Sequence, residues 1–233
     1  MTTHRAYPRS GRERPRASGV APRTSRGGRV GASERKREAI VEAALRLFMR
    51  DGYARTSVDA IADEAQVSKR TIYNHYGDKE NLFLSVIGER FDSMMAVFVD
   101  LMDAYLSDVP DDAVEANIVA FAREATALAA RSQERLALLR LVSAEAPHFP
   151  ELRARRMRPQ TVAGEIATRL VRLAARGLLE VPEPEEAANH LFALTIGQIN
   201  NRSLLRSVEL TDAEIEHIAT SGAHAFLRAY LPR

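Results

Sequence analysis

Polar and cationic side chains crowd into one short stretch in the first third of the chain. They are Lys69, Arg70, Thr71, Tyr73, Asn74 and His75. Ammonium and guanidinium groups bind phosphate oxygens, and guanidinium, hydroxyl and amide groups form hydrogen bonds with base edges in a major groove. Ile72 and Tyr76 are spaced so that they face a core instead. The stretch therefore predicts a short helix with one buried face and one face suited to double-stranded DNA.

A second short helix is expected immediately before this one, joined to it by a tight turn. Ser57, with Thr56 as a second candidate, is expected to cap its first turn, and Ser68 to cap the helix that begins at Lys69. The apolar face of the earlier helix consists of Val58, Ile61, Ala62 and Ala65. Gln66 occupies the turn, where glycine is common because the backbone needs a positive φ, and a side chain there costs about 1 kcal/mol. The pattern is typical of a helix-turn-helix.

Helices on both sides close this pair into a small unit. Residues 33–50 have the apolar spacing of an amphipathic helix, which is expected to stop at Gly52. After the pair, Asp78 is a candidate N-cap for a longer helix over 81–107. An ordinary helical hairpin with a solvated polar face is the alternative interpretation. The surrounding helices favour a three-helix unit that reads DNA.

These segments resemble the N-terminal DNA-binding domain of the TetR family of bacterial transcription regulators, from residue 33 to about residue 85. The matching segments are 43–48, 51–53, 56–58, 61–62, 67–69, 71–73, 76 and 79–83. The resemblance implies that Thr56 and Lys79 hold phosphates, and that the polar residues after Ser68 touch bases or backbone. The predicted DNA-binding residues are Thr56, Ser57, Ser68, Lys69, Arg70, Thr71, Tyr73, Asn74, His75 and Lys79.

Composition narrows the class of protein. The 233 residues hold no cysteine, which excludes disulfides, thiolate catalysis and cysteine-bound zinc. No uncharged apolar run reaches the length of about 18 residues that a membrane span needs. Zinc-protease, nucleophile-elbow, Walker and dinucleotide motifs are missing, and Glu186 with His190 alone falls short of a metal site. We therefore predict a cytoplasmic bacterial protein that is not an enzyme and has no metal or cofactor.

Charge is distributed unevenly along the chain. Residues 1–32 carry eight arginines against one glutamate, a net charge of +7, and residues 33–80 carry nine basic and nine acidic side chains. The remainder carries 16 basic and 21 acidic side chains, so the whole chain has a net charge of +2. Residues 1–32 lack any helical or strand period and are predicted to be a disordered basic arm. Either the arm follows the DNA backbone, or it is a solvated tail.

The rest of the chain is expected to be helical, so we predict an all-α fold. The helices of the body are expected at 81–107, 112–130, 133–145, 151–176, 184–206 and 211–230. The predicted domains are the arm at 1–32, the helix-turn-helix domain at 33–80, and a regulatory and dimerisation domain at 81–233. The last helix is expected to begin with a capping box made by Thr211 and Glu214.

The body resembles a known branch of the family and carries a candidate dimer surface. Residues 141–152, 177–179 and 184 resemble the AefR-like branch of the TetR family. The helices at 184–206 and 211–230 are apolar enough to form a four-helix interface with a second copy of the chain across a two-fold axis. Burial of the first of these helices inside a monomer is the alternative. A two-fold dimer would read two half-sites of a palindromic operator.

The first helix of the body carries a stripe of adaptable apolar side chains. Phe91, Met94, Met95, Phe98 and Met102 are candidate walls of a small-molecule pocket between helices. Ordinary core is the alternative interpretation of this stripe. A ligand bound there is expected to shift the helix over 81–107 and so change the spacing of two DNA-reading units. We predict a homodimeric repressor released from its operator by an unknown small-molecule effector. There are two alternatives: a transcriptional activator, or a helical interaction module that reads no DNA.

Overall fold

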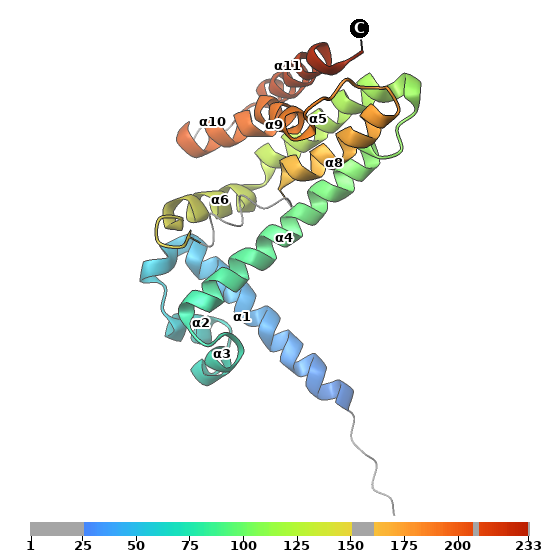
Figure 1. The fold of residues 1–233 in the computed structure, drawn as a ribbon. Helices are drawn as coiled ribbons and strands as arrows, with labels where there is room; N and C mark the ends of the chain where they lie inside the picture. The colour runs from blue at the N-terminus through green and yellow to red at the C-terminus, as the bar shows by residue number, and fades with distance from the viewer. Residues whose placement is uncertain (1–25, 151–160, 207–209, 233) are drawn as a thin grey trace, which may run out of the picture.

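A computed structural model of the chain describes residues 26–150, 161–206 and 210–232. Within these ranges the protein consists of helices and contains no strand, which confirms the predicted all-α fold. Figure 1 shows a small unit of short helices and a larger body, with the long helix α4 (Lys79–Leu106) running from one to the other. No helix in the described ranges is long and apolar enough to cross a membrane.

The small unit is built as the sequence predicted. Its helices are α1 (Arg26–Arg55), α2 (Val58–Glu64) and α3 (Lys69–Tyr76). Ser57, Ser68 and Asp78 are N-caps whose side chains accept a hydrogen bond from a backbone N–H in the first turn. Gln66 has a φ of 53°, which confirms that the turn between α2 and α3 needs a positive φ. The local sequence thus determines where α2, α3 and α4 begin.

Helix α1 begins earlier than predicted. It starts at Arg26 and not at residue 33, so residues 26–32 are helical and do not belong to a disordered arm. Once strong helix formers further along have nucleated a helix, each added residue contributes another hydrogen bond. The chain kinks at Gly52, where a φ of 80° confirms the predicted stop. The remainder of the predicted arm, residues 1–25, lies outside the described residues.

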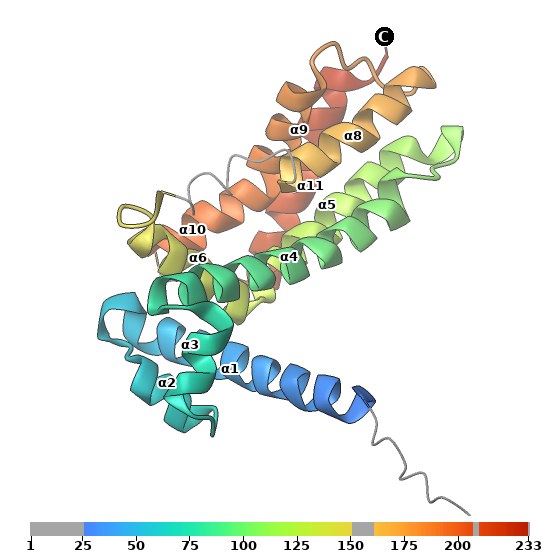
Figure 2. The ribbon, with the colours of Figure 1, turned by 60° about the horizontal axis from the view of Figure 1, so that its bottom comes forward.

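The body packs around the upper half of α4 (Figures 1 and 2). Its elements are η1 (Asp111–Ala113), α5 (Val114–Arg131), α6 (Gln133–Glu145), α8 (Val162–Ala175), α9 (Pro184–Phe192), η2 (Ala193–Gly197), α10 (Gln198–Arg206) and α11 (Asp212–Tyr230). Helix α11 packs along α5 and begins with the predicted capping box of Thr211 and Glu214. The helix predicted over 151–176 is described from residue 161 onward, where it is α8, and most of its earlier part lies outside the described residues.

The helix predicted over 184–206 is interrupted in its middle. Element η2 is a π-turn between α9 and α10. The buried Thr195 hydroxyl in this turn donates a hydrogen bond to the Leu191 carbonyl at 2.6 Å. On the facing helix α11, a Cβ added to Gly222 would lie 2.4 Å from the Leu194 carbonyl oxygen. Helix α11 therefore packs directly against the backbone of the π-turn.

Two hydrophobic clusters hold the helices together. The lower cluster joins α1, α2 and α3 to the start of α4 and to α6, through residues that include Phe83, Leu138 and Val142. The upper cluster joins the rest of α4 to α5, α8, α9, η2 and α11. The domain boundary predicted between residues 80 and 81 therefore runs through a shared core, because α4 and α6 supply part of the packing of the small unit.

Candidate nucleic-acid interface

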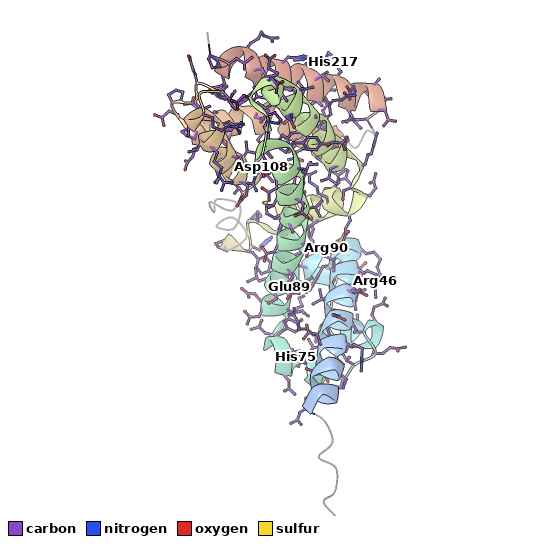
Figure 3. All side chains as sticks on the ribbon, turned by 90° about the vertical axis from the view of Figure 1, so that its right-hand side faces the viewer. Arg46, His75, Glu89, Arg90, Asp108 and His217 are labelled. Carbon is purple, nitrogen blue, oxygen red and sulfur yellow. The ribbon has the colours of Figure 1, made fainter. Side chains whose placement is uncertain are left out.

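The polar side of α3 faces solvent. Ile72 is completely buried beneath the helix, whereas Arg70, Asn74 and His75 are exposed and Tyr73 exposes 43% of its surface. Figure 3 shows His75 on the small unit, at the opposite end of the molecule from His217 on α11. The helix thus presents hydrogen-bonding groups on a face that the other described residues do not cover, and its dimensions suit a major groove.

Hydroxyl groups organise the starts of α2 and α3. Ser68 Oγ accepts a hydrogen bond from the Thr71 N–H at 3.1 Å, and the two hydroxyl oxygens are 2.8 Å apart. Ser57 Oγ accepts a hydrogen bond from the Ala60 N–H at 3.1 Å. A hydroxyl donates once and accepts twice, so each of these groups keeps capacity for a phosphate or a base while it caps its helix.

Lys69 is exposed but its charge is already paired. Its Nζ lies 2.8 Å from Asp59 Oδ1 and 3.0 Å from Asp59 Oδ2, across the turn between α2 and α3. The hydrogen bond to Asp59 raises the pKa of Lys69. A phosphate has to compete with this carboxylate for the ammonium group. Arg70, by contrast, forms no ion pair with the described residues, so it is the more available cation on α3.

The structure corrects the prediction that Thr56 holds a phosphate through its side chain. Only 3% of Thr56 is exposed. Its hydroxyl points inward, and its single proton is shared between the carbonyl oxygens of Gly52 at 2.8 Å and Leu47 at 3.2 Å. Those carbonyls lie at the end of α1, where a helix leaves acceptors unsatisfied. Thr56 therefore closes α1, and its hydroxyl is not free to meet DNA.

The Lys79 ammonium group also contacts the segment around Thr56, at the end of α1. Its Nζ donates to the carbonyl oxygens of Tyr53 at 2.8 Å and Thr56 at 2.9 Å, and lies 4.2 Å from the centre of the Tyr53 ring. An ammonium group has three N–H donors, so one remains for a phosphate. Lys79 thus has a structural role, holding the loop between α1 and α2, and the phosphate contact that the resemblance implied stays a prediction.

An aromatic cluster joins the small unit to the end of α6, and the sequence pattern did not reveal it. The Tyr53 ring contacts Phe149 edge-on with ring centres 4.7 Å apart, and Phe83 lies 4.9 Å from Phe149. Beside them, Glu145 Oε1 accepts a hydrogen bond from the Tyr53 N–H at 3.2 Å. Tyr53 is more than 90 positions from Phe149 and from Glu145, and the segment at Tyr53 carried only the signal of a helix stop.

Two consecutive residues of α4, Glu89 and Arg90, form ion pairs with the small unit and with the body. Glu89 accepts two hydrogen bonds from the Arg37 guanidinium on α1, at 2.8 and 3.2 Å. Arg90 forms an ion pair with Glu134 at the start of α6. Figure 3 shows Glu89 and Arg90 on α4 at the level where the small unit meets the body. At this level α4 is therefore joined by ion pairs both to α1 and to α6.

The predicted pocket residues fall into both hydrophobic clusters. Phe91 and Met94 pack against the lower cluster, and Phe98 and Met102 belong to the upper one, where 4% and 0% of their surfaces are exposed. Met95 is partly exposed and belongs to neither cluster. The stripe follows α4 across the junction between the two clusters, and the core interpretation accounts for the burial of Phe98 and Met102.

The geometry of the small unit defines a helix-turn-helix protein, and the two parts of the chain match known families. Residues 40–86 match the bacterial regulatory proteins of the tetR family, and residues 116–232 match the C-terminal domain of AefR-like transcriptional repressors. The second match alone covers half of the chain. The chain therefore belongs to the TetR family of transcriptional regulators.

Similar structures extend this likeness to most of the chain, and a curated relative matches a shorter part of it. A TetR-family regulator from Mesorhizobium loti MAFF303099 is 29% identical with a TM-score of 0.77, over 86% of this chain and 98% of that one. The flavonoid-responsive regulator FrrA is 30% identical with a TM-score of 0.66, over 86% of this chain and 99% of its own. The transcriptional activator FasR of Mycolicibacterium smegmatis is 34% identical over 88 residues, 38% of this chain and 37% of FasR. For FasR and seven other curated relatives, the match spans between 20% and 41% of the relative's length.

Proposed function

We propose that the protein is a ligand-responsive repressor that binds a palindromic DNA operator as a homodimer. The observation that carries this proposal is the exposed polar face of α3, held on a closed three-helix unit with Ile72 completely buried beneath it. The match of residues 116–232 to AefR-like repressors supports repression. DNA lies in the bacterial cytoplasm, and we place the protein there.

Few charges supply the attraction to DNA. The small unit as predicted, residues 33–80, has as many acidic as basic side chains, and Lys69 is paired with Asp59. Arg70 and the third N–H of Lys79 remain for the phosphates and base edges. Because the field of one unit is weak, two units bound to two half-sites are needed for tight and selective binding.

The last helices of the body are the proposed dimer surface. Helix α11 buries Ile218 and Phe226 on the side that packs against the body, and exposes His217, Ser221 and His224 on the other side. These exposed positions recur at helical spacing and form one outward face. A second copy of the chain can pack the same face of α11 across a two-fold axis, together with the run over 184–206.

Two contacts are proposed to couple the body to the DNA-reading unit. The first is α4, which carries the Arg37–Glu89 and Arg90–Glu134 pairs on adjacent positions. The second is the end of α6, where Glu145 and the Phe149 ring hold Tyr53. An effector that binds one arrangement of these helices more tightly favours that arrangement, and so shifts α3 relative to its copy in the dimer. The free energy of operator binding then changes by at most the difference in the effector's binding free energy between the two arrangements.

A gel-shift assay on the protein's own upstream region and on neighbouring promoters tests the DNA-binding proposal. Arg70→Ala is expected to relax the preference at one base position of each half-site by roughly 1–3 kcal/mol, because a contact to a base edge is lost. Arg172→Ala, which removes an exposed arginine from α8 in the body, is the matched control. No sequence-specific shift by the wild type at moderate salt would sink the proposal, and an unchanged preference in Arg70→Ala would remove Arg70 from the base contacts.

A variant of Lys79 separates its two roles. Lys79→Met is expected to weaken binding to all sequences alike and to reduce the slope of log affinity against log salt by about 1, because one phosphate contact is lost. It is also expected to lower the free energy of unfolding by about 1 kcal/mol, since the Tyr53 and Thr56 carbonyls lose their donor. Titrations at several salt concentrations and urea unfolding measure the two effects. An unchanged salt slope would assign Lys79 to structure alone.

A repressor and an activator of this family would use the same DNA-reading unit and the same regulatory body. One relative, FasR, is named as an activator. A reporter gene behind the bound promoter distinguishes them. Deletion of the regulator gene is expected to raise expression if the protein is a repressor. A fall in expression would establish activation and leave the DNA-binding proposal standing.

A further inference from the structure

Two arginines of the body are equally buried but differently paired. Arg169 and Arg135 each expose 6% of their surface. Arg169 on α8 donates to the carboxylates of Asp103 at 2.7 Å and Glu165 at 2.9 Å, so its charge is compensated twice. Arg135 on α6 forms no ion pair with a carboxylate of the described residues. Burying an unpaired charge is unfavourable, so this difference calls for a physical reason.

The contacts of Arg135 are neutral. Its guanidinium donates to the Ala129 carbonyl at 2.9 Å and to Asn200 Oδ1 at 2.6 Å. Burial lowers the pKa of Arg135 to about 10, because no opposite charge offsets the loss of water. Ala129 lies in the last turn of α5, where the helix dipole supplies about half of a negative charge. A guanidinium has five N–H donors, and these two hydrogen bonds leave it both charge and donors for an anion.

Arg135 lies in a seam between α6 and α10 that offers cations and amides but, among the described residues, no available carboxylate. We define the α6–α10 seam by Arg135, Arg140, Asn200 and Ser203. Arg140 also reaches across it and donates to the Ser203 carbonyl at 3.0 Å. Helix α10 has no acidic residue. Both acidic residues of α6 are engaged elsewhere, Glu134 with Arg90 and Glu145 with the Tyr53 N–H.

The residues around the seam include both polar and apolar groups. Asn200 is half-buried, so its contact with Arg135 lies at an edge of the body that solvent reaches. Behind it, Ala125 and Ala129 on α5 and Ile199 on α10 are completely buried in the upper cluster. On the same α5, Thr126 is completely buried and its hydroxyl has no hydrogen-bond partner within the described ranges. These groups suit a ligand with one anionic end and an apolar remainder.

We propose that the α6–α10 seam, centred on Arg135, binds the carboxylate of an organic acid with an apolar body, and that such an acid is the effector. This inference rests on the proposed function, because it names the ligand class of the regulator. Helix α6 begins near Arg135 and ends at Glu145, which holds Tyr53. A carboxylate that draws the guanidinium away from Asn200 therefore acts on the helix that contacts the DNA-reading unit.

The test uses the full chain with acetate, and with acetamide as the uncharged isostere, at constant ionic strength. Acetate is expected to raise the thermal unfolding midpoint in a saturable way that acetamide does not match, since a ligand that binds only the folded state stabilises it. Arg135→Met is expected to need at least about tenfold more acetate for the same rise, because a charge-assisted hydrogen bond is lost. Arg172→Met, which removes an exposed arginine from α8, is the matched control.

Each outcome decides the proposal. An acetate effect of equal size in wild type and Arg135→Met, or no acetate-specific effect in the wild type, overturns it and leaves Arg135 as a cap of α5. If Arg135→Met does not fold, Arg135→Gln keeps an amide donor for the Ala129 carbonyl and is expected to lose the acetate effect in the same way. Octanoate is expected to act at lower concentration than acetate and than octanamide, and equal potency of the two acids contradicts an apolar body.

The same preparations separate this inference from the proposed function. A wild-type chain that shifts its operator but shows no acetate-specific stabilisation refutes the carboxylate site alone. An acetate effect that depends on Arg135, in a chain that shifts no promoter fragment, refutes DNA regulation alone. When both hold, octanoate is expected to reduce operator binding by the wild type, and Arg135→Met is expected to need about tenfold more of it.

Discussion

Replacing Phe149 with alanine is expected to lower the free energy of unfolding by about 3 kcal/mol or more, the usual loss for a buried aromatic ring. Phe149 is 4% exposed and its ring packs against the rings of both Tyr53 and Phe83, which also contact each other. The other two rings come from α1 and α4, so Phe149 is the contribution of the segment after α6. Its removal leaves a cavity at the junction between the small unit and the body.

Urea unfolding followed by circular dichroism measures this effect. Phe149→Ala is also expected to broaden or split the transition, because the small unit loses part of its hold on the body and unfolds at lower urea. Phe149→Leu keeps most of the side-chain volume and is expected to lose less than half as much free energy of unfolding. Val171→Ala, at a position on α8 that is 48% exposed, is expected to change the free energy of unfolding little. A loss below about 1 kcal/mol in Phe149→Ala would show that the junction does not depend on this ring.

The second large effect is expected at Gly222, where even one methyl group meets backbone. A Cβ there would lie 2.4 Å from the Leu194 carbonyl oxygen and 3.0 Å from Thr195 Cγ2. Neither helix can yield by rotating a side chain, so α11 has to move away from the π-turn at Ala193–Gly197. Gly222→Ala is therefore expected to lower the free energy of unfolding by about 2–3 kcal/mol, as overpacked cores do.

A matched substitution gives the opposite sign. Gly31 lies within helix α1 and a Cβ added there meets nothing within 4 Å. Gly31→Ala is expected to raise the free energy of unfolding by about 0.5–1 kcal/mol, because alanine is the better helix former. Denaturation of both variants in parallel isolates packing from helix propensity. Stabilisation by Gly222→Ala would show that α11 does not pack against the π-turn as closely as described. If α11 also forms the dimer surface, Gly222→Ala is expected to weaken self-association in sedimentation experiments.

Local sequence signals predicted the elements of the DNA-reading unit. Ser57, Ser68 and Asp78 mark helix starts because a capping side chain acts within its own first turn. Gln66 lies at the turn that needs a positive φ, and the burial of Ile72 follows from helical spacing. The outward face of α3 is predictable for the same reason, since a helix with one apolar stripe turns its other side to solvent.

The local sequence signals could not predict contacts between segments that lie far apart in the chain. Thr56 has the residue type and position of a phosphate ligand, but its hydroxyl is used by the carbonyls of Gly52 and Leu47. The π-turn facing Gly222 depends on how closely α11 approaches, which helical periodicity does not encode. A sequence lists arginines without distinguishing Arg169, which has two carboxylates beside it, from Arg135, which has none beside it in the described part of the chain.

The sequence by itself determined that the chain is helical, where the helix-turn-helix begins and turns, and which side chains α3 offers to DNA. These properties depend on neighbours within about one or two turns of helix, so they can be read along the chain. Only the tertiary structure decided which polar groups of α3 are unpaired among the described residues, how Tyr53 is held from the end of α6, and which buried charge has no carboxylate partner among those residues. Those properties depend on residues separated by tens to more than a hundred positions, and the fold alone brings them together.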